Sequence, residues 1–215
     1  MKLDDLPRAS ASLWIKNSPL NLTFREINNK VHMPQQFSIK MKWDLSPECL
    51  TQCRQILQRK IWLRLDGNRQ YDLQNAHRFI SSFSEEERQF IEYLEEPCID
   101  YHSSQNLCAH FNIPLAFDET LSELVQNNQS YEQQLINIGK DSHACFFILR
   151  PSLLGLKHTL NCLSLGTDKQ ISMILSSSYE PKNAMFIYDY LMSRINHKYL
   201  HGLDTLKFIK HSPHS

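Results

Sequence analysis

Short apolar runs alternate with helix-length segments along most of this chain, and several of the runs stop abruptly at a charged residue. The clearest run covers residues 61–66, where strand-forming side chains end at Asp66. Two later runs end in the same way, at Glu95 and at Asp118. Short apolar runs bounded by polar residues are typical of strands buried in a parallel sheet.

The same pattern predicts the other elements. Strands are predicted at 37–43, 61–66, 91–95, 113–118, 144–150 and 170–175, with weaker ones at 20–25 and 203–206. Helices are predicted at 10–15, from Ser46 with Pro47 in its first turn, at 73–83, 84–90, 103–111 and 181–195, and after the turn at 151–155. The polar, glutamine-rich segment 120–140 is interpreted as a helix plus a solvated surface insertion.

Strands that alternate with helices indicate βαβ units and a parallel α/β sheet. The chain has neither a G-x-G-x-x-G loop nor a G-K-[ST] loop, so a nucleotide-binding doubly wound sheet loses its main support. Polar groups at nearly every predicted strand end favour a closed barrel of the TIM type, in which the reactive groups lie at the carboxyl ends of the strands.

Charge and cysteine content narrow the functional classes. The 23 basic and 23 acidic residues balance, which gives no reason to expect a nucleic-acid or membrane partner. No apolar run approaches the roughly 20 residues that span a bilayer, and the first residues lack the apolar core of a signal peptide. The six cysteines form no C-x-x-C pair, so we expect reduced thiols in a cytoplasmic protein. His197 and His201 lack the glutamate of a zinc-protease motif and are interpreted as surface residues.

The acids at three successive strand ends are the main candidates for chemistry. Because parallel strands end at one edge, we expect Asp66, Glu95 and Asp118 to converge on one cation. The alternative for any one of them is an ordinary exposed carboxylate, which is less convincing for three acids in register.

Two lysines are candidates for acid–base chemistry. Lys40 and Lys42 lie two apart on a predicted strand, so both point to one face. Mutual repulsion and partial burial are expected to lower their pKa values and make a neutral amine available. A solvated edge strand with alternating lysines is the plainer alternative.

These segments together resemble the enolase superfamily. The motifs that carry the resemblance, in chain order, are K-M-K at 40–42, R-L-D-G-N at 64–68, L-E-E-P at 94–97, F-D-E-T at 117–120, L-R-P-S-L-L-G at 149–155, S-S-S at 176–178 and G-L-D-T-L at 202–206. Within the superfamily they look most like the o-succinylbenzoate synthase family of menaquinone biosynthesis. The resemblance implies a TIM-type (β/α) barrel with a separate α+β capping domain.

The resemblance also implies roles for individual residues. Asp66, Glu95 and Asp118 would bind Mg²⁺, with Lys42 as the acid/base and Lys40 as electrostatic support. Gly155, Ser176, Ser177 and Ser178 would bind the substrate, a small carboxylate. The implied reaction removes the proton α to a carboxylate and then expels water, so the implied activity is that of a hydro-lyase.

Arg150 departs from the family pattern, which usually has a second lysine at this place. A guanidinium supplies charge but stays protonated, so it cannot act as a base. This argues against racemases and epimerases, which need a base on each face. A dehydratase with one base tolerates the change, and a decayed site is the alternative.

The second departure concerns the cap. Little sequence precedes Lys40, so we expect most of the capping domain to be missing from this sequence. Residues 1–36 would be a cap remnant or the first strand region, 37–209 the catalytic barrel and 210–215 a tail. A fragment, a barrel completed by a partner, an incompletely defined product and a degenerate relative stay open. The competing functions are a catalytically impaired barrel that binds a dicarboxylate or a protein, and another superfamily activity such as a cycloisomerase.

Overall fold

The structure is a computed structural model that describes residues 12–15, 38–127, 130–141, 145–169, 171–178, 185–194 and 201. Within these segments, seven strands form one sheet in which every neighbouring pair is parallel and the strand order follows the chain order. The strands are β1 (Ser12–Ile15), β2 (Ser38–Lys42), β3 (Trp62–Asp66), β4 (Ile91–Glu95), β5 (Leu115–Phe117), β6 (Cys145–Leu149) and β7 (Ser172–Leu175).

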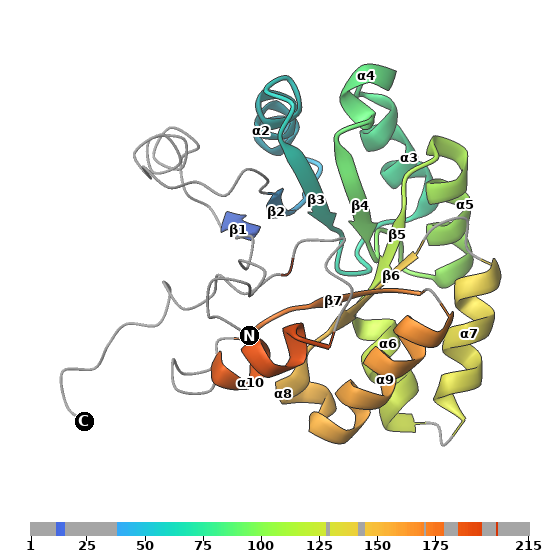
Figure 1. Cartoon of the computed structure of the whole chain (residues 1–215). Helices are drawn as coiled ribbons and strands as arrows, with labels where there is room; N and C mark the ends of the chain where they lie inside the picture. The colour runs from blue at the N-terminus through green and yellow to red at the C-terminus, as the bar shows by residue number, and fades with distance from the viewer. Residues whose placement is uncertain are drawn as a thin grey trace, which may run out of the picture.

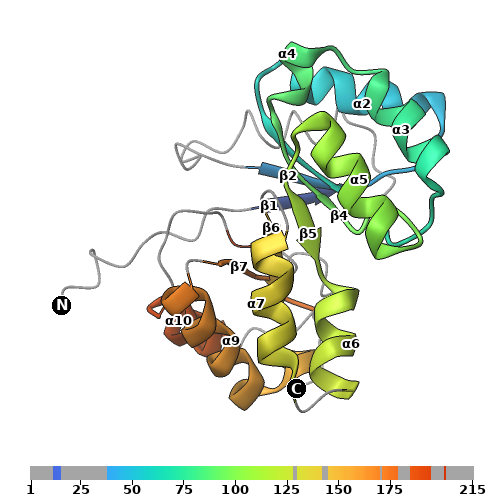
Figure 2. The same ribbon diagram turned by 90° about the vertical axis from the view of Figure 1, so that its right-hand side faces the viewer.

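Helices connect successive strands from β2 onward. They are α2 (Pro47–Leu57), α3 (Leu73–Ser81), α4 (Glu85–Arg88), α5 (Tyr101–Phe111), α6 (Glu119–Asn127), α7 (Tyr131–Asp141), α8 (Pro151–Leu154), α9 (Leu156–Lys169) and α10 (Met185–Met192). They form an arc around the outer face of the curved sheet (Figure 1), and in the view turned by 90° α5 and α7 lie toward the viewer (Figure 2).

The two faces of the sheet have different cores. The large core packs outward-facing strand residues such as Leu65 and Leu94 against the helices. A smaller cluster fills the concave face with Tyr93, Ala116, Phe146, Ile148 and Ile174. Side chains alternate between these faces along each strand, so a strand's last inward residue lies at the carboxyl-end edge of the concave face.

The helix starts predicted at Ser46 and Ser84 are confirmed by their caps. The Ser46 side chain accepts a hydrogen bond from Cys49 N, and Pro47 occupies the first turn of α2. Ser84 and Glu87 form a reciprocal capping box at α4. These caps satisfy backbone N–H groups that a helix start leaves without partners.

Two predictions about elements were wrong. Residues 12–15 are a strand paired with β2, where a helix was predicted, because pairing outweighs the weak local preference of a four-residue segment. The segment 120–140 is not a solvated insertion. It forms α6 and α7, which bury Leu121 and Leu135 completely. The predicted strands at 20–25 and 203–206 lie outside the described residues.

The parallel α/β sheet is confirmed, and its form is that of a partial barrel. Among the described residues no pairing joins β1 to β7, so closure of the barrel stays a prediction. None of the described helices has the length and apolar character needed to cross a membrane.

Candidate functional site

The strand register brings the predicted site residues to one edge of the concave face. Lys42 is paired with Asp66, and Asp66 is paired with Glu95 on the next strand. Glu95 is paired with Ala116, so Asp118, two residues further on, follows the same face. In parallel strands, paired residues point to the same side of the sheet.

Lys40 lies between two of the acids. Its Nζ is 2.7 Å from Oε1 and 2.6 Å from Oε2 of Glu95, and 3.1 Å from Oδ2 of Asp66. Burial opposes the charged ammonium, but the attraction of Glu95 and Asp66 outweighs it, so the pKa of Lys40 is raised. The prediction that this pKa is lowered was wrong, because it considered the neighbouring lysine and not the carboxylates on the adjoining strands.

Asp118 is paired with Arg150, whose Nη2 donates a hydrogen bond to Oδ2 of Asp118. Asp118 is 2% exposed, and burial first, then repulsion from Glu95, raises its pKa. The pKa of Asp66 is raised by the same two causes. The three acids therefore form one electrostatically coupled group.

Lys42 is at the end of β2 and is exposed, whereas Lys40 is partly buried. Among the described residues its ammonium has no hydrogen-bond partner in the cluster formed by Lys40, Asp66, Glu95, Asp118 and Arg150. The register still places Lys42 beside Asp66, at the carboxyl end of β2. Lys42 is thus the accessible amine of the site, and Lys40 is the internal one.

The loop after β3 orients Asp66. Asn68 donates to Oδ1 of Asp66 through both its backbone N (3.1 Å) and its Nδ2 (2.7 Å). Asn68 and Arg69 have φ values of 47° and 53°, and this tight turn lets Gly67 N donate to Glu95 O over 2.8 Å. The turn therefore fixes the carboxylate and ties β3 to β4.

Glu96 ties the next two strand ends together. It is 3% exposed, and its Oε1 accepts hydrogen bonds from Asp118 N (3.0 Å) and Thr120 N (2.6 Å). Its Oε2 accepts a hydrogen bond from Arg69 Nε. Glu96 holds the backbone of Asp118 in place, although it does not join the carboxylate cluster itself.

The predicted substrate-binding residues lie at the ends of β6 and β7. Gly155 has a φ of 75°, which favours glycine, and a Cβ there would meet nothing within 4 Å. Ser177 is 6% exposed, and Ser176 N donates to Leu149 O over 2.9 Å, which ties the loop after β7 to β6. Ser176, Ser177 and Ser178 directly follow β7, and their role in substrate binding stays a prediction.

The donor set suits a hard divalent cation. In the described part of the chain, no three His, Cys, Asp or Glu side chains already surround a common point. Glu95 Oε2 is nevertheless buried and accepts no hydrogen bond from any described residue, although the Lys40 ammonium is 2.6 Å away. Burial and repulsion from Glu95 raise the pKa values of Asp66 and Asp118, and a divalent cation bound between the three carboxyl groups would relieve that repulsion. Carboxylate oxygens of this kind are the ligands that Mg²⁺ prefers, and the residues fit the ion.

The sequence analysis assigned no role to Arg64, Asn68, Arg69, Glu92 or Glu96. Three of them, Arg64, Asn68 and Glu96, lie in the motifs that carry the family resemblance. The position of Glu96, directly before a proline at a strand end, was a signal that its side chain could fix the following loop.

His201 was predicted at the surface and is instead 4% exposed, with Nδ1 accepting a hydrogen bond from Leu175 N. His197 lies outside the described residues. All six cysteines are free thiols, as predicted.

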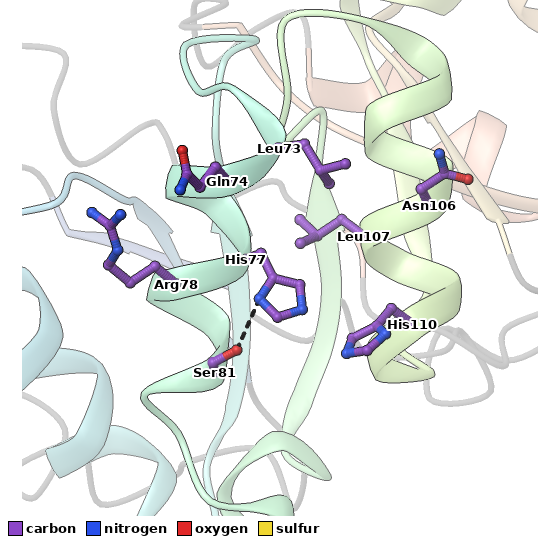
Figure 3. Close-up of a pocket in the computed structure, with 8 residues that line it drawn as sticks. All are labelled: Leu73, Gln74, His77, Arg78, Ser81, Asn106, Leu107 and His110. Carbon is purple, nitrogen blue, oxygen red and sulfur yellow. Dashed lines mark hydrogen bonds between the residues drawn. The ribbon is translucent and has the colours of Figure 1, made fainter.

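A separate groove lies on the outer face between α3 and α5, with a volume of about 770 Å³. Figure 3 shows His77 of α3 and His110 of α5 on its two sides, with Ser81 bonded to His77 over 3.1 Å. Its lining residues come from helices and not from strand ends. The carboxylate cluster lies on the other face of the sheet and remains the candidate site.

Comparisons with known proteins agree with this geometry. The family described as "Enolase C-terminal domain-like" matches residues 22–140. An o-succinylbenzoate synthase from Haemophilus influenzae is 25% identical over 69% of this chain and 43% of its own length. The chain thus spans about two fifths of the length of the curated relatives it matches.

Solved structures show the same fold. A mandelate racemase/muconate lactonizing protein from Herpetosiphon aurantiacus superposes with a TM-score of 0.73 at 19% identity, over 95% of this chain and 57% of the other. An o-succinylbenzoate synthase from Thermosynechococcus elongatus, complexed with Mg in its active site, gives a TM-score of 0.68 at 19% identity. That match covers 93% of this chain and 61% of the other.

Proposed function

This chain belongs to the enolase C-terminal domain-like family, and we propose that it is a Mg²⁺-dependent hydro-lyase of the o-succinylbenzoate synthase type. The observation that carries the proposal is the meeting of Asp66, Glu95 and Asp118 with Lys40 and Arg150 at one edge of the parallel sheet. Similarity to o-succinylbenzoate synthases over about two thirds of the chain supports the choice of reaction. Residues 37–209 would carry the catalytic barrel.

Asp66, Glu95 and Asp118 would hold Mg²⁺, and the bound ion would supply positive charge for the carboxylate of the substrate. Lys40 and Arg150 add fixed positive charge beside the same position. Charge arranged in advance stabilises the enediolate that develops when the α-proton leaves.

Lys42 would move the protons. Its exposed amine at the end of β2, beside Asp66, would take the α-proton from a substrate bound over the acids. The resulting lysine ammonium can then give a proton to the leaving hydroxyl if both groups lie on one face of the substrate. Loss of water leaves an aromatic ring, which makes the step favourable.

Arg150 would act as a cation and not as a second base, because a guanidinium stays protonated. Its Nε is buried and has no hydrogen-bond partner among the described residues, while its Nη2 donates a hydrogen bond to Asp118. An unpaired buried donor at this edge is suited to a carboxylate oxygen of the substrate. Gly155 and the serines 176–178 would complete the substrate contacts.

The test is a dehydration assay on the purified chain. The substrate is the succinyl-substituted hydroxycyclohexadiene carboxylate that loses water to give o-succinylbenzoate, and the product is followed by its aromatic absorbance. Turnover that rises with added Mg²⁺ and disappears with EDTA is the expected result. Absence of turnover at saturating Mg²⁺ would contradict the proposal.

One observation favours a second candidate, a catalytically impaired barrel that binds a dicarboxylate. Lys40 and Arg150 already pair with all three acids in the structure, so the acids are partly neutralised without a metal. Calorimetry with succinate or o-succinylbenzoate separates the two candidates. Binding without turnover and without dependence on Mg²⁺ would favour the binding protein.

A further inference from the structure

Strand β4 changes face partway along its length. Ile91 belongs to the outer core, whereas Tyr93, two residues later, belongs to the inner cluster. In a regular strand these two residues would share a face. The register explains the change, because Leu63 is paired with Ile91 but the next residue, Arg64, is paired with Tyr93. Glu92 is therefore the extra residue of a β-bulge.

The bulge decides where Glu95 points. Beyond it, Asp66 is paired with Glu95, and both face the concave side. If β4 ran on from Ile91 in regular register, Leu94 would lie opposite Asp66 and Glu95 would point into the outer core. A slip of one residue moves a whole strand segment to the other face. The bulge thus places Glu95 in the carboxylate cluster.

Arg64 and Glu92 hold the bulge. Arg64 Nε is 2.7 Å from Oε2 of Glu92, and Arg64 Nη2 is 3.1 Å from Oε1, so the pair is bidentate. Arg64 is 1% exposed and lies over the ring of Tyr93, 5.1 Å from its centroid. The guanidinium therefore contacts both the extra residue and the first residue of the displaced register.

We propose that the Arg64–Glu92 pair is a positioning device that fixes the bulge in β4 and thereby turns Glu95 into the site. The inference rests on the proposed function, since it concerns a residue assigned to metal binding. Arg64 and Glu92 act through strand register and touch neither the ion nor the substrate in this account. Arg64 lies one inward position before Asp66, and Glu92 immediately precedes Tyr93, the inward residue before Glu95.

The first test is Mg²⁺ binding to the full chain by titration calorimetry. Arg64→Met removes the bidentate pair with Glu92 that holds the bulge. The expected result is binding weakened about tenfold or more, the scale seen when a residue supporting a metal ligand is lost. Arg88→Met is the matched control, because Arg88 also packs over an aromatic ring, that of Phe111 at 5.2 Å, but on the outer face. Wild-type affinity in Arg64→Met would overturn the proposal.

The second test is rescue by deletion. Removing Glu92 from the Arg64→Met chain gives a regular strand in which Tyr93, Leu94 and Glu95 keep their present partners. Mg²⁺ affinity should then return to within about threefold of the wild type. If Arg64 acted only through its positive charge near the site, deleting Glu92 would not restore Mg²⁺ affinity. Failure of a folded deletion variant to recover binding would overturn the register argument.

A third variant covers the case in which the deletion prevents folding. Arg64→Lys keeps the positive charge but cannot form the bidentate pair, so it should also weaken Mg²⁺ binding. Full affinity in Arg64→Lys would show that the clamp is not needed.

A crystal structure of Arg64→Met gives a readout that does not depend on metal. The expected finding is loss of the pairing between Asp66 and Glu95 or disorder of Glu95. A bulge and a Glu95 position identical to those of the wild type would overturn the inference. Absence of Mg²⁺ binding in the wild type would instead contradict the proposed function, and the crystal structure would still decide the role of the pair.

Discussion

Lys40 and Lys42 lie two residues apart on one strand, and their surroundings assign them different tasks. Lys40 is held between Glu95 and Asp66, and these carboxylates stabilise its charged form. A proton held so firmly is poorly suited to transfer, whereas a fixed positive charge is useful beside a developing enediolate. Lys42 is exposed at the end of β2, and under the proposed function it would be the amine that transfers the proton.

This assignment predicts that Lys42→Arg retains charge but loses proton transfer, because arginine stays protonated. Turnover, and exchange of the substrate α-proton in D₂O, should fall by about 10²- to 10⁴-fold. Lys60→Arg is the matched control, because Lys60 is exposed in the loop that precedes β3. Exchange within a few-fold of wild type in Lys42→Arg would assign the base elsewhere.

A thiol gives a prediction that is independent of function. Burial raises the pKa of Cys145 to about 11, and this cysteine is only partly buried. The thiolate is the reactive form, so its fraction should still rise nearly tenfold per pH unit between pH 8 and about 9.5. Alkylation followed by mass spectrometry measures this. A rate that levels off near pH 9 would mean that the pKa is not raised.

At the scale of elements, the turns that follow the strands contribute as much as the strands to the positions of the acidic residues. Two consecutive glutamates at the end of β4 make different contacts, since Glu95 lies in the carboxylate cluster and Glu96 accepts a hydrogen bond from the backbone N of Asp118. Gly67 directly follows Asp66, and the turn that contains it packs against the turn after β4. A Cβ at Gly67 would lie 2.6 Å from Pro97 Cα and 2.9 Å from Glu96 O. Backbone atoms cannot move aside cheaply, so the approach of these two turns requires glycine.

Gly67→Ala should therefore lower the free energy of unfolding by about 1–3 kcal/mol, the cost of overpacking a tight contact. Urea denaturation measures the change. Gly139→Ala is the control, since it lies in α7 and its Cβ would meet only the Ile171 side chain, at 3.2 Å. Equal stabilities for the wild type and Gly67→Ala would refute the close approach of the turns.

At the scale of the whole molecule, an ordered series of parallel strands delivers one inward polar residue after another to the same edge. The alternation of apolar runs with helical segments was enough to predict β2 through β7, because each run is buried against helices and stops at a polar residue. The acids at 66, 95 and 118 were predicted from the same strand ends.

Other features depended on contacts that a local pattern does not contain. Strand β1 gains its form from pairing with β2, and the polar surface of α6 and α7 concealed their buried leucines. The only sign of the bulge in the sequence is the spacing of two acidic residues in this strand. Glu92 and Glu95 are three apart, so in a regular strand they would point to opposite faces. The high pKa of Lys40 required its partners on two other strands.

Titration calorimetry of Mg²⁺ into the wild-type chain and into Asp118→Asn tests the central claim most directly. We expect one ion per wild-type chain, and affinity weakened about a hundredfold or more when a direct ligand loses its charge. Asp100→Asn is a suitable control, because this exposed acid caps α5 away from the acid cluster. Equal affinity in the wild type and Asp118→Asn, or no binding by the wild type, would contradict a metal centre built from the acids of β3, β4 and β5.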